Sequence, residues 1–160
     1  KCIKVDQNLD VRRDALEREY VYKINFEKNI SPLENRYYEH VNYHIETKNL
    51  PKVYKLFLGV HDFLSFAGRL APNNANTMRE IKHISHIKNE NSIEFRIIGK
   101  SFLYQQVRRM IGSFLLLMKG KITINQLSDV INIPRKGSIN LLPSSKGLYL
   151  SKIKYDGVKI

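Results

Sequence analysis

The feature that most constrains the fold is a long stretch of apolar residues at helical spacing in the second half of the chain. Its apolar members recur three and four positions apart and are Leu103, Val107, Met110, Ile111, Phe114, Leu115 and Met118. Because a helix turns by about 100° per residue, this spacing gathers them into one stripe. The stretch therefore predicts an amphipathic helix from Phe102 to Lys119, ended by Gly120, with its stripe packed into a core.

Segments rich in β-branched and aromatic residues predict the strands of a sheet. They are Tyr20–Phe26, Ile81–Ile87, Ser92–Ile98 and Leu148–Tyr155. The middle two, joined at residues 88–91, predict a hairpin.

Two shorter helices and a loop complete the pattern. Leu50 to Gly59, with Asn49 as cap, and Thr123 to Ile131 carry helical spacing, and residues 71–76 predict an exposed loop. The 160 residues contain no internal repeat or low-complexity linker. We therefore expect one α+β domain, with helices on one face of a mainly antiparallel sheet.

The charge of the chain favours a polyanionic partner. It carries 27 Lys and Arg against 15 Asp and Glu, a formal net charge of +12, with a sequence pI near 9.8. Nucleic acid leads the candidates. Membrane-surface proteins and ordinary lysine-rich proteins share such a balance, so charge alone leaves these classes open.

Cysteine content and apolar runs exclude other classes. Cys2 is the single cysteine, so an intrachain disulfide and a zinc site built on several cysteines are excluded, and we expect an intracellular, reducing compartment without knowing which. The longest apolar run, residues 114–118, is far shorter than the roughly 20 residues that span a bilayer, so we expect no membrane partner. The chain starts at Lys1 without a signal segment, so we expect its natural start to lie upstream or to have been removed.

Two neighbouring arginines of the predicted helix fall in different environments. Arg109 lies nearly opposite the apolar stripe, which predicts a solvated or phosphate-facing side chain. Arg108 lies at the border of the stripe. Two interpretations of Arg108 stay open: a guanidinium turned inward towards a carboxylate, or a border residue that reaches to solvent.

Residues 95–128 form a stretch of one charge sign. They contain no Asp or Glu, and their cations are Arg96, Lys100, Arg108, Arg109, Lys119 and Lys121. With Phe102 and Tyr104 interleaved, the stretch is typical of a surface that follows an RNA backbone. We predict Lys100 and Arg109 as RNA contacts, assign Phe102 to the core and leave Tyr104 open.

The histidines do not predict a metal site. His83 and His86 lack a third ligand at suitable spacing, so we expect no metal. His61 and Asp62 are adjacent, and a turn held by side-chain hydrogen bonds explains them better than acid–base catalysis does.

Several strings resemble one enzyme family in order and approximate spacing. They are GVHDFLSF at 59–66, GKSFLYQQVRRMIG at 99–112, GLYL at 147–150 and, less strictly, RRDALEREYVYKI at 12–24. Together they resemble the TruA-like tRNA pseudouridine synthases over nearly the whole chain. The resemblance implies the second of two ferredoxin-like halves and the isomerisation of uridine to pseudouridine in tRNA, near the anticodon stem-loop. It also implies no cofactor and a homodimer for the full-length protein.

The resemblance also assigns roles to particular residues. It implies that Tyr20 contacts the flipped base and takes part in proton movement at carbon 5. Arg108 would pair with the catalytic carboxylate, and Leu148 would line the uracil pocket. Arg12 and Arg18 would contact either the RNA backbone or the remaining half of the enzyme, and the sequence does not separate these two options.

One family motif is missing from the 160 residues. The family nucleophile is an aspartate in a Gly-Arg-Thr-Asp-x-Gly-Val-His type string upstream of the first segment, and neither Asp10 nor Asp14 has that context. We therefore expect the carboxy-terminal part of a synthase, inactive when alone. The alternative is a basic RNA-binding or partner-docking module without catalysis, which the upstream sequence would distinguish. If the enzyme interpretation is right, Tyr20 and Arg108 must converge on one cavity.

Overall fold

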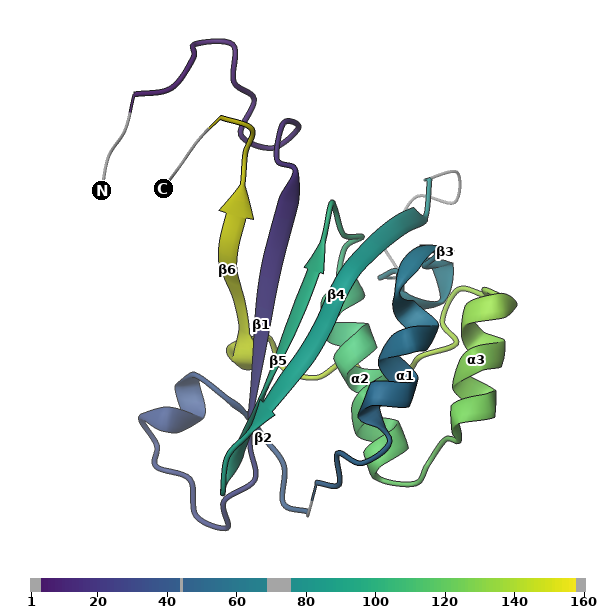
Figure 1. Ribbon diagram of the computed structural model, residues 1–160. Helices are drawn as coiled ribbons and strands as arrows, with labels where there is room; N and C mark the ends of the chain where they lie inside the picture. The colour runs from purple at the N-terminus through teal and green to yellow at the C-terminus, as the bar shows by residue number, and fades with distance from the viewer. Residues whose placement is uncertain (1–3, 44, 69–75, 158–160) are drawn as a thin grey trace.

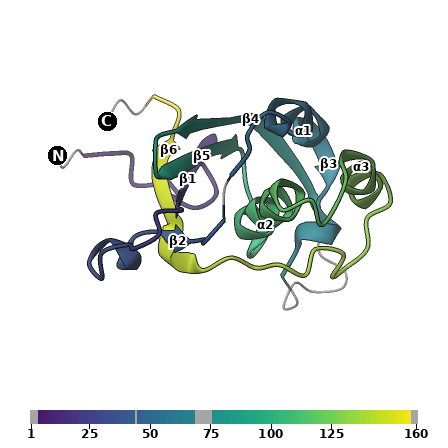
Figure 2. The ribbon, with the colours of Figure 1, turned by 90° about the horizontal axis from the view of Figure 1, so that it is seen from below.

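A sheet runs through the molecule, and the α-helices of the described residues lie on one of its faces (Figures 1 and 2). The computed structural model describes residues 4–43, 45–68 and 76–157. Within them the strands are β1 (Glu17–Asn25), β2 (Glu39–His40), β3 (Gly59–Asp62), β4 (Met78–Lys88), β5 (Ser92–Gly99) and β6 (Leu148–Lys154). Their order is β2-β1-β5-β4-β3, and β6 also pairs with β1.

The strand pairing is antiparallel everywhere except between β1 and β2. Strands β4 and β5 form the expected hairpin, and the whole of β5 pairs with β1. The predicted α+β fold, with a mainly antiparallel mixed sheet and helices on one face, is therefore confirmed. The two short strands β2 and β3 were not predicted.

The helices are α1 (Leu50–Phe57), α2 (Gln106–Met118) and α3 (Ile124–Asn132). Thr123 caps the start of α3: its hydroxyl accepts a hydrogen bond from the Gln126 N–H, and the Gln126 side chain accepts one from the Thr123 N–H. Asn49 precedes α1 as expected, but its side chain makes no capping hydrogen bond. The loop expected at 71–76 lies, up to residue 75, outside the described residues.

Helix α2 begins four residues later than its apolar spacing predicts. Gln105 adopts the left-handed conformation with φ of 63°, which interrupts a right-handed helix. The Gln106 Oε1 accepts a hydrogen bond from the Leu103 N–H at 2.8 Å. Residues 102–105 therefore form a short, hydrogen-bonded loop between β5 and α2.

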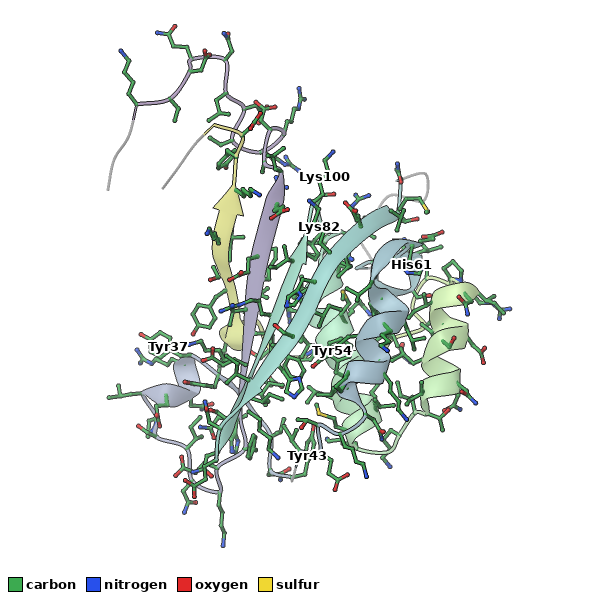
Figure 3. All side chains as sticks on the ribbon, in the orientation of Figure 1. Tyr37, Tyr43, Tyr54, His61, Lys82 and Lys100 are labelled. Atoms are coloured by element: carbon green, nitrogen blue, oxygen red, sulfur yellow. The ribbon has the colours of Figure 1, made fainter. Side chains whose placement is uncertain are left out.

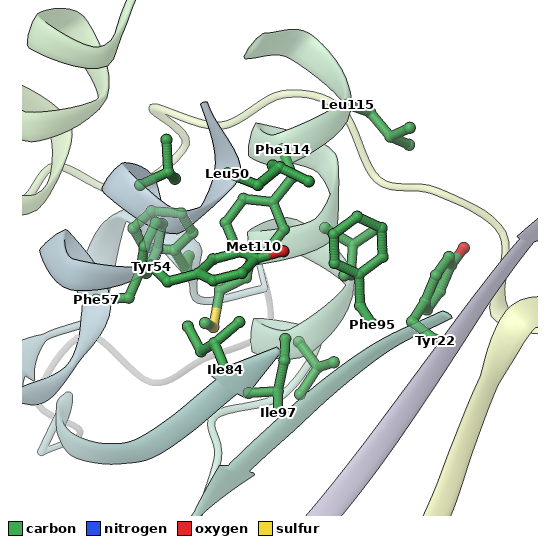
Figure 4. Close-up of a cluster of buried hydrophobic side chains, with 14 of the residues drawn as sticks. Tyr22, Leu50, Tyr54, Phe57, Ile84, Phe95, Ile97, Met110, Phe114 and Leu115 are labelled. Carbon is green, nitrogen blue, oxygen red and sulfur yellow. The ribbon is translucent and has the colours of Figure 1, made fainter. Parts of the chain in front are cut away.

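Aromatic side chains fill the space between β4, β5 and the helices (Figure 4). Phe114 lies with its ring centroid 5.4 to 5.6 Å from those of Tyr54, Phe57 and Phe95. Phe57, Phe95 and Phe114 are fully buried. Burying each such side chain contributes about 1.5–3 kcal/mol, so this cluster holds the helices against the sheet.

His86, one of the two histidines considered as metal ligands, has a structural partner. His86 Nδ1 lies 2.8 Å from the Tyr54 hydroxyl, and burial lowers the pKa of His86 and raises the pKa of Tyr54. His83 is exposed. The described residues contain no group of three His, Cys, Asp or Glu side chains placed to hold a metal ion.

His61 and Asp62 lie in β3 and not in a turn, which corrects the expectation. The turn follows directly afterwards, where the Asp62 carboxylate accepts the Leu64 N–H at 2.9 Å. His61 Nε2 lies 2.9 Å from the Leu58 carbonyl oxygen. These contacts give both residues local structural roles.

Strand β6 has an irregularity in its pairing with β1. Tyr20 pairs with Leu150, whereas Glu19 pairs with Lys152, so Ser151 is an extra residue on β6. Such a β-bulge increases the local twist of the strand. Among the described helices, none has both the length and the apolar character to cross a membrane.

Candidate functional site

A cleft of about 370 Å³ opens between β1, β6 and the loop that leads into α2. Its lining residues are Arg12, Tyr20, Phe102, Leu103, Tyr104, Gln105, Gln106, Val107, Arg108 and Leu148. Four of the residues that the sequence singled out, Arg12, Tyr20, Arg108 and Leu148, therefore line one cavity. The predicted convergence of Tyr20 and Arg108 is confirmed, while the chemical roles of these residues stay predictions.

Tyr20 presents its ring to the cleft from β1. The strand alternation places Tyr20 on the same side as Tyr22 and Ile24, which belong to the core. The Tyr20 ring packs edge to face against Phe102, with the centroids 5.2 Å apart. None of the described residues forms a hydrogen bond with the Tyr20 hydroxyl, so this group is available to a ligand.

Arg108 reaches the cleft from the first turn of α2. Its Nε donates a hydrogen bond to the Pro143 carbonyl oxygen at 2.8 Å, which fixes the plane of the guanidinium. This bond uses one of the several N–H donors of the group. Arg108 is therefore half-buried and anchored to the backbone, an arrangement that neither sequence interpretation described.

Three further contacts hold the segment that anchors Arg108. The Tyr22 hydroxyl donates to the Ser144 carbonyl oxygen at 2.6 Å, and the Ser144 N–H donates to Glu39 Oε2 at 2.8 Å. Burial, and then the nearby charge of Glu39, raise the pKa of Tyr22, so its hydroxyl keeps the proton that it donates. Gly112 lets α2 approach the same segment, because a Cβ there would collide with the Leu141 carbonyl oxygen.

The loop that carries Arg12 is fixed at the other wall of the cleft. The Asp10 carboxylate accepts the N–H groups of Arg12 and Arg13, both at 2.9 Å, and these hydrogen bonds lower the pKa of Asp10. Arg18 donates through Nη1 to the Lys100 carbonyl oxygen at 2.5 Å and through Nη2 to the Arg12 carbonyl oxygen. Arg18 thus ties this loop to the end of β5.

The predicted RNA contacts therefore occupy different positions. Arg12 lines the cleft. Arg18 does not, and its guanidinium donates hydrogen bonds to two backbone carbonyl oxygens. Lys100 is exposed at the end of the sheet where the cleft lies (Figure 3). An RNA-binding role for these three residues stays a prediction.

The expected placement of Arg109 is wrong. Only 7% of the residue is exposed, and its Nη1 donates to the Ile139 carbonyl oxygen at 2.5 Å. The segment that leads from α3 to β6 covers the side of α2 that the apolar stripe leaves free. Arg109 lines a hollow separate from the cleft, together with Lys136 and Asn140.

The cleft has the chemistry of a site for an unpaired nucleotide base. Aromatic rings and Leu148 supply apolar walls, Arg12 and Arg108 supply positive charge, and none of its described lining residues is acidic. Proteins that take a base out of a stack use this combination of aromatic contact and cations. The fold and cleft together define an α+β protein with a basic, aromatic-lined pocket.

Sequence comparison gives the family. The sequence model described as tRNA pseudouridine synthase matches residues 53–156, and the chain belongs to this family.

Relatives match over nearly the whole chain. The tRNA pseudouridine synthase A 2 of Bacillus anthracis is 24% identical over 152 residues, which are 95% of this chain and 62% of the relative. The tRNA pseudouridine synthase A of Lactobacillus helveticus is 29% identical, over 97% of this chain and 59% of the relative. The tRNA pseudouridine synthase A 1 of Clostridium tetani is 30% identical, over 93% of this chain and 60% of the relative. The chain thus spans about three fifths of the length of these curated relatives.

A solved structure is also similar. The crystal structure of a Cbf5-Nop10-Gar1 complex matches with a TM-score of 0.40 and 16% sequence identity, covering 68% of this chain and 28% of that chain.

Sequence reasoning missed the residues that position the site. Glu39, Tyr22 and Ser144 reach Arg108 through backbone groups, and no spacing or motif in the sequence signals such contacts. Gln105 is also unpredicted, because a left-handed glutamine has no composition signal. Tyr104, which was left open, lines the cleft with 59% of the residue exposed.

Proposed function

We propose that this chain forms part of a tRNA pseudouridine synthase, which isomerises uridine to pseudouridine near the anticodon stem-loop. Within that enzyme it would be the second of two ferredoxin-like halves. The observation that carries the proposal is that Tyr20, Arg108 and Leu148, each at its family motif position, line one cleft. Membership of the family and the net charge of +12 support tRNA as the substrate.

The cleft explains how a uridine could be held outside its stack. Extruding a base costs a few kcal/mol of stacking, and an aromatic face in the pocket offsets part of that cost. Tyr20 is suited to this contact because Phe102 fixes its ring while its hydroxyl stays available. Leu148, which pairs with Tyr22 across the β1–β6 ladder, supplies an apolar wall for the uracil.

Arg108 is proposed to orient the catalytic carboxylate. A guanidinium beside a carboxylate favours the charged form and fixes its plane through paired hydrogen bonds. The hydrogen bond to Pro143 holds the Arg108 guanidinium in a fixed position, ready to pair with the catalytic carboxylate. The family aspartate motif does not occur in the 160 residues, so we propose that a segment outside them supplies this carboxylate.

The proposed partners follow from the same resemblance. Arg12 at the cleft wall and Lys100 at the exposed end of β5 are proposed to hold phosphates of the tRNA. The full-length enzyme is proposed to be a homodimer, as the family resemblance implies.

The test is Arg108→Met in the protein expressed from its complete gene. Pseudouridine formation releases the hydrogen at carbon 5, so it is measured as tritium released from tRNA labelled at carbon 5 of uridine. We expect the variant to lose activity by about 100-fold or more, because the charge that orients the acid is gone, with tRNA affinity nearly unchanged. Arg96→Met is the matched control, since Arg96 is exposed on β5 and pairs with Glu19 at 3.4 Å.

Two outcomes would count against the proposal. Equal activity of Arg108→Met and the unsubstituted protein would remove Arg108 from the chemistry. If the unsubstituted protein binds tRNA tightly but releases no tritium from any tRNA, a basic RNA-binding module without catalysis explains the molecule better.

A further inference from the structure

Tyr104 is an exposed aromatic residue in the wall of the cleft that the proposed chemistry does not use. The residue is 59% exposed, whereas Phe102, two positions earlier, packs against the core. Tyr20, Arg108 and Leu148 account for a uridine in the cleft. The exposed ring of Tyr104 at the wall of the cleft therefore needs a separate explanation.

The loop that carries Tyr104 is built to hold it in place. The Gly68 N–H donates to the Tyr104 carbonyl oxygen at 2.9 Å, and a Cβ on Gly68 would lie 2.6 Å from Cδ1 of the Tyr104 ring. Gly68 thus lets the ring lie directly over the backbone. On the other side, the fully buried Gln106 accepts the Leu103 N–H.

Gln105, next to Tyr104, adopts a conformation that residues other than glycine rarely take. Its φ and ψ of 63° and 4° lie in the left-handed region, and it is the single non-glycine residue with positive φ among those that the structure describes. Such conformations persist where surrounding contacts enforce them, and they cluster at ligand-binding sites. The position of Tyr104 at the cleft is thus imposed by its loop.

Removing a base from a stack exposes more than the base itself. The nucleotide beside it loses one stacking partner, and an aromatic ring at the mouth of the pocket can replace that partner. Tyr104 lines the same cleft as Tyr20 and is much more exposed than the rings behind it. It is therefore placed to meet a neighbour of the base that enters.

We propose that Tyr104 is a stacking platform for the unpaired base next to the target uridine, in the same tRNA. The inference rests on the proposed function, because it takes the cleft as the uridine pocket. It adds a second base subsite, which contributes to the affinity and to the choice of the unpaired region.

Tyr37 provides a matched control for Tyr104. It is 58% exposed, but it does not line the cleft. Figure 3 shows Tyr37 towards the opposite end of the sheet from Lys100, which lies two positions before Phe102, the first residue of the cleft loop. A general effect of losing an exposed tyrosine should therefore be equal at the two positions.

The experiment uses the protein expressed from its complete gene and a set of anticodon stem-loop RNAs. Each RNA carries the fluorescent base 2-aminopurine at one unpaired position in turn. A 2-aminopurine that stacks on an aromatic ring stays dim, so we expect one position to be dim with the unsubstituted protein and with Tyr104→Phe. That position should brighten severalfold with Tyr104→Leu, which keeps an apolar side chain without the ring.

Affinity for the unlabelled stem-loop gives a second readout. Tyr104→Leu should weaken binding by about 10-fold, within the range that loss of one base–aromatic stack produces, while Tyr104→Phe and Tyr37→Leu bind as the unsubstituted protein does. Equal melting temperatures of the variants would show that the loop is intact. If the melting temperatures differ, the affinities of Tyr104→Leu and Tyr104→Phe are compared at a temperature where both variants have the same folded fraction.

The outcomes separate this inference from the proposed function. The fluorescence scan needs no turnover, so it reports stacking even if tritium release shows that the protein is not a synthase. The stacking role of Tyr104 would be overturned if the fluorescence of none of the labelled positions depended on Tyr104. It would also be overturned if the position that depends on Tyr104 were not adjacent to the uridine that releases tritium. A dependent position directly beside that uridine supports it.

Discussion

The helix-bearing face of the sheet has two regions of opposite character, a closed aromatic region and an open cleft. In the closed region, Phe57, Phe95 and Phe114 are fully buried and contact one another or shared neighbours. In the cleft, Tyr104 is mostly exposed and Arg108 is half-buried. Helix α2 serves both regions, and between Gln106 and Leu115 Arg108 is the one residue that is half-buried, while the others are buried.

The two regions are held by different forces. Ring packing closes the aromatic region, so its energy is spread over many contacts. The cleft depends on a few directed hydrogen bonds to backbone carbonyls, such as those from Arg108 to Pro143 and from Tyr22 to Ser144. We therefore expect substitutions in the closed region to change the free energy of unfolding, and substitutions at the cleft to change turnover per folded molecule.

The largest effect is expected for Phe114→Ala in the closed region. Removing a fully buried ring leaves a cavity and should lower the free energy of unfolding by about 3–5 kcal/mol, measured by denaturant titration. Leu33→Ala is the control, because Leu33 is exposed, and it should change that free energy by less than about 0.5 kcal/mol. Similar losses for both variants would contradict the closed packing.

Glu39→Ala at the cleft should change turnover and not the free energy of unfolding. The Ser144 N–H loses its acceptor, the segment that anchors Arg108 loosens, and kcat for tRNA should fall by about 10-fold or more with KM nearly constant. Glu39→Gln keeps an acceptor oxygen and should restore most of the rate. Glu94→Ala, which breaks an ion pair with Lys23 instead, is the matched control. A parallel loss of kcat in the Gln variant would show that Glu39 does not act through Ser144.

The smallest expected effect is that of Tyr20→Phe. The ring stays against Phe102, so base stacking and tRNA affinity should persist, while the loss of one hydrogen bond from the hydroxyl should lower turnover by roughly 2- to 10-fold. Tyr54→Phe removes a hydroxyl from the closed region and should lower stability without changing turnover. Unchanged turnover in Tyr20→Phe would assign Tyr20 to stacking alone.

The sequence predicted the closed region well because local spacing determines it. The apolar stripe of α2, the hairpin of β4 and β5 and the start of α3 at Thr123 all follow from short-range patterns. Strand β3 was missed because it is short and is defined by its pairing with β4. Its sequence alone carries too few residues to show an alternation.

The cleft was predictable only through the family resemblance. Periodicity placed Arg109 on the surface, because it cannot show that a distant segment near Ile139 covers that side of the helix. It also extended α2 back to Phe102, because the left-handed Gln105 leaves no pattern. Glu39 is far from Arg108 in sequence and acts through backbone groups, so no residue pattern marks it.

The extra residue in β6 shifts the phase of the strand halfway along its length. In an uninterrupted ladder, Leu148 and Leu150 would be followed on their side by Lys152, and Ile153 would point the other way. Because Ser151 is inserted, Ile153 stands opposite Arg18 as Leu148 stands opposite Tyr22. One serine thus keeps an apolar side chain on the helix-bearing side beyond the cleft and sends Lys152 to the far side.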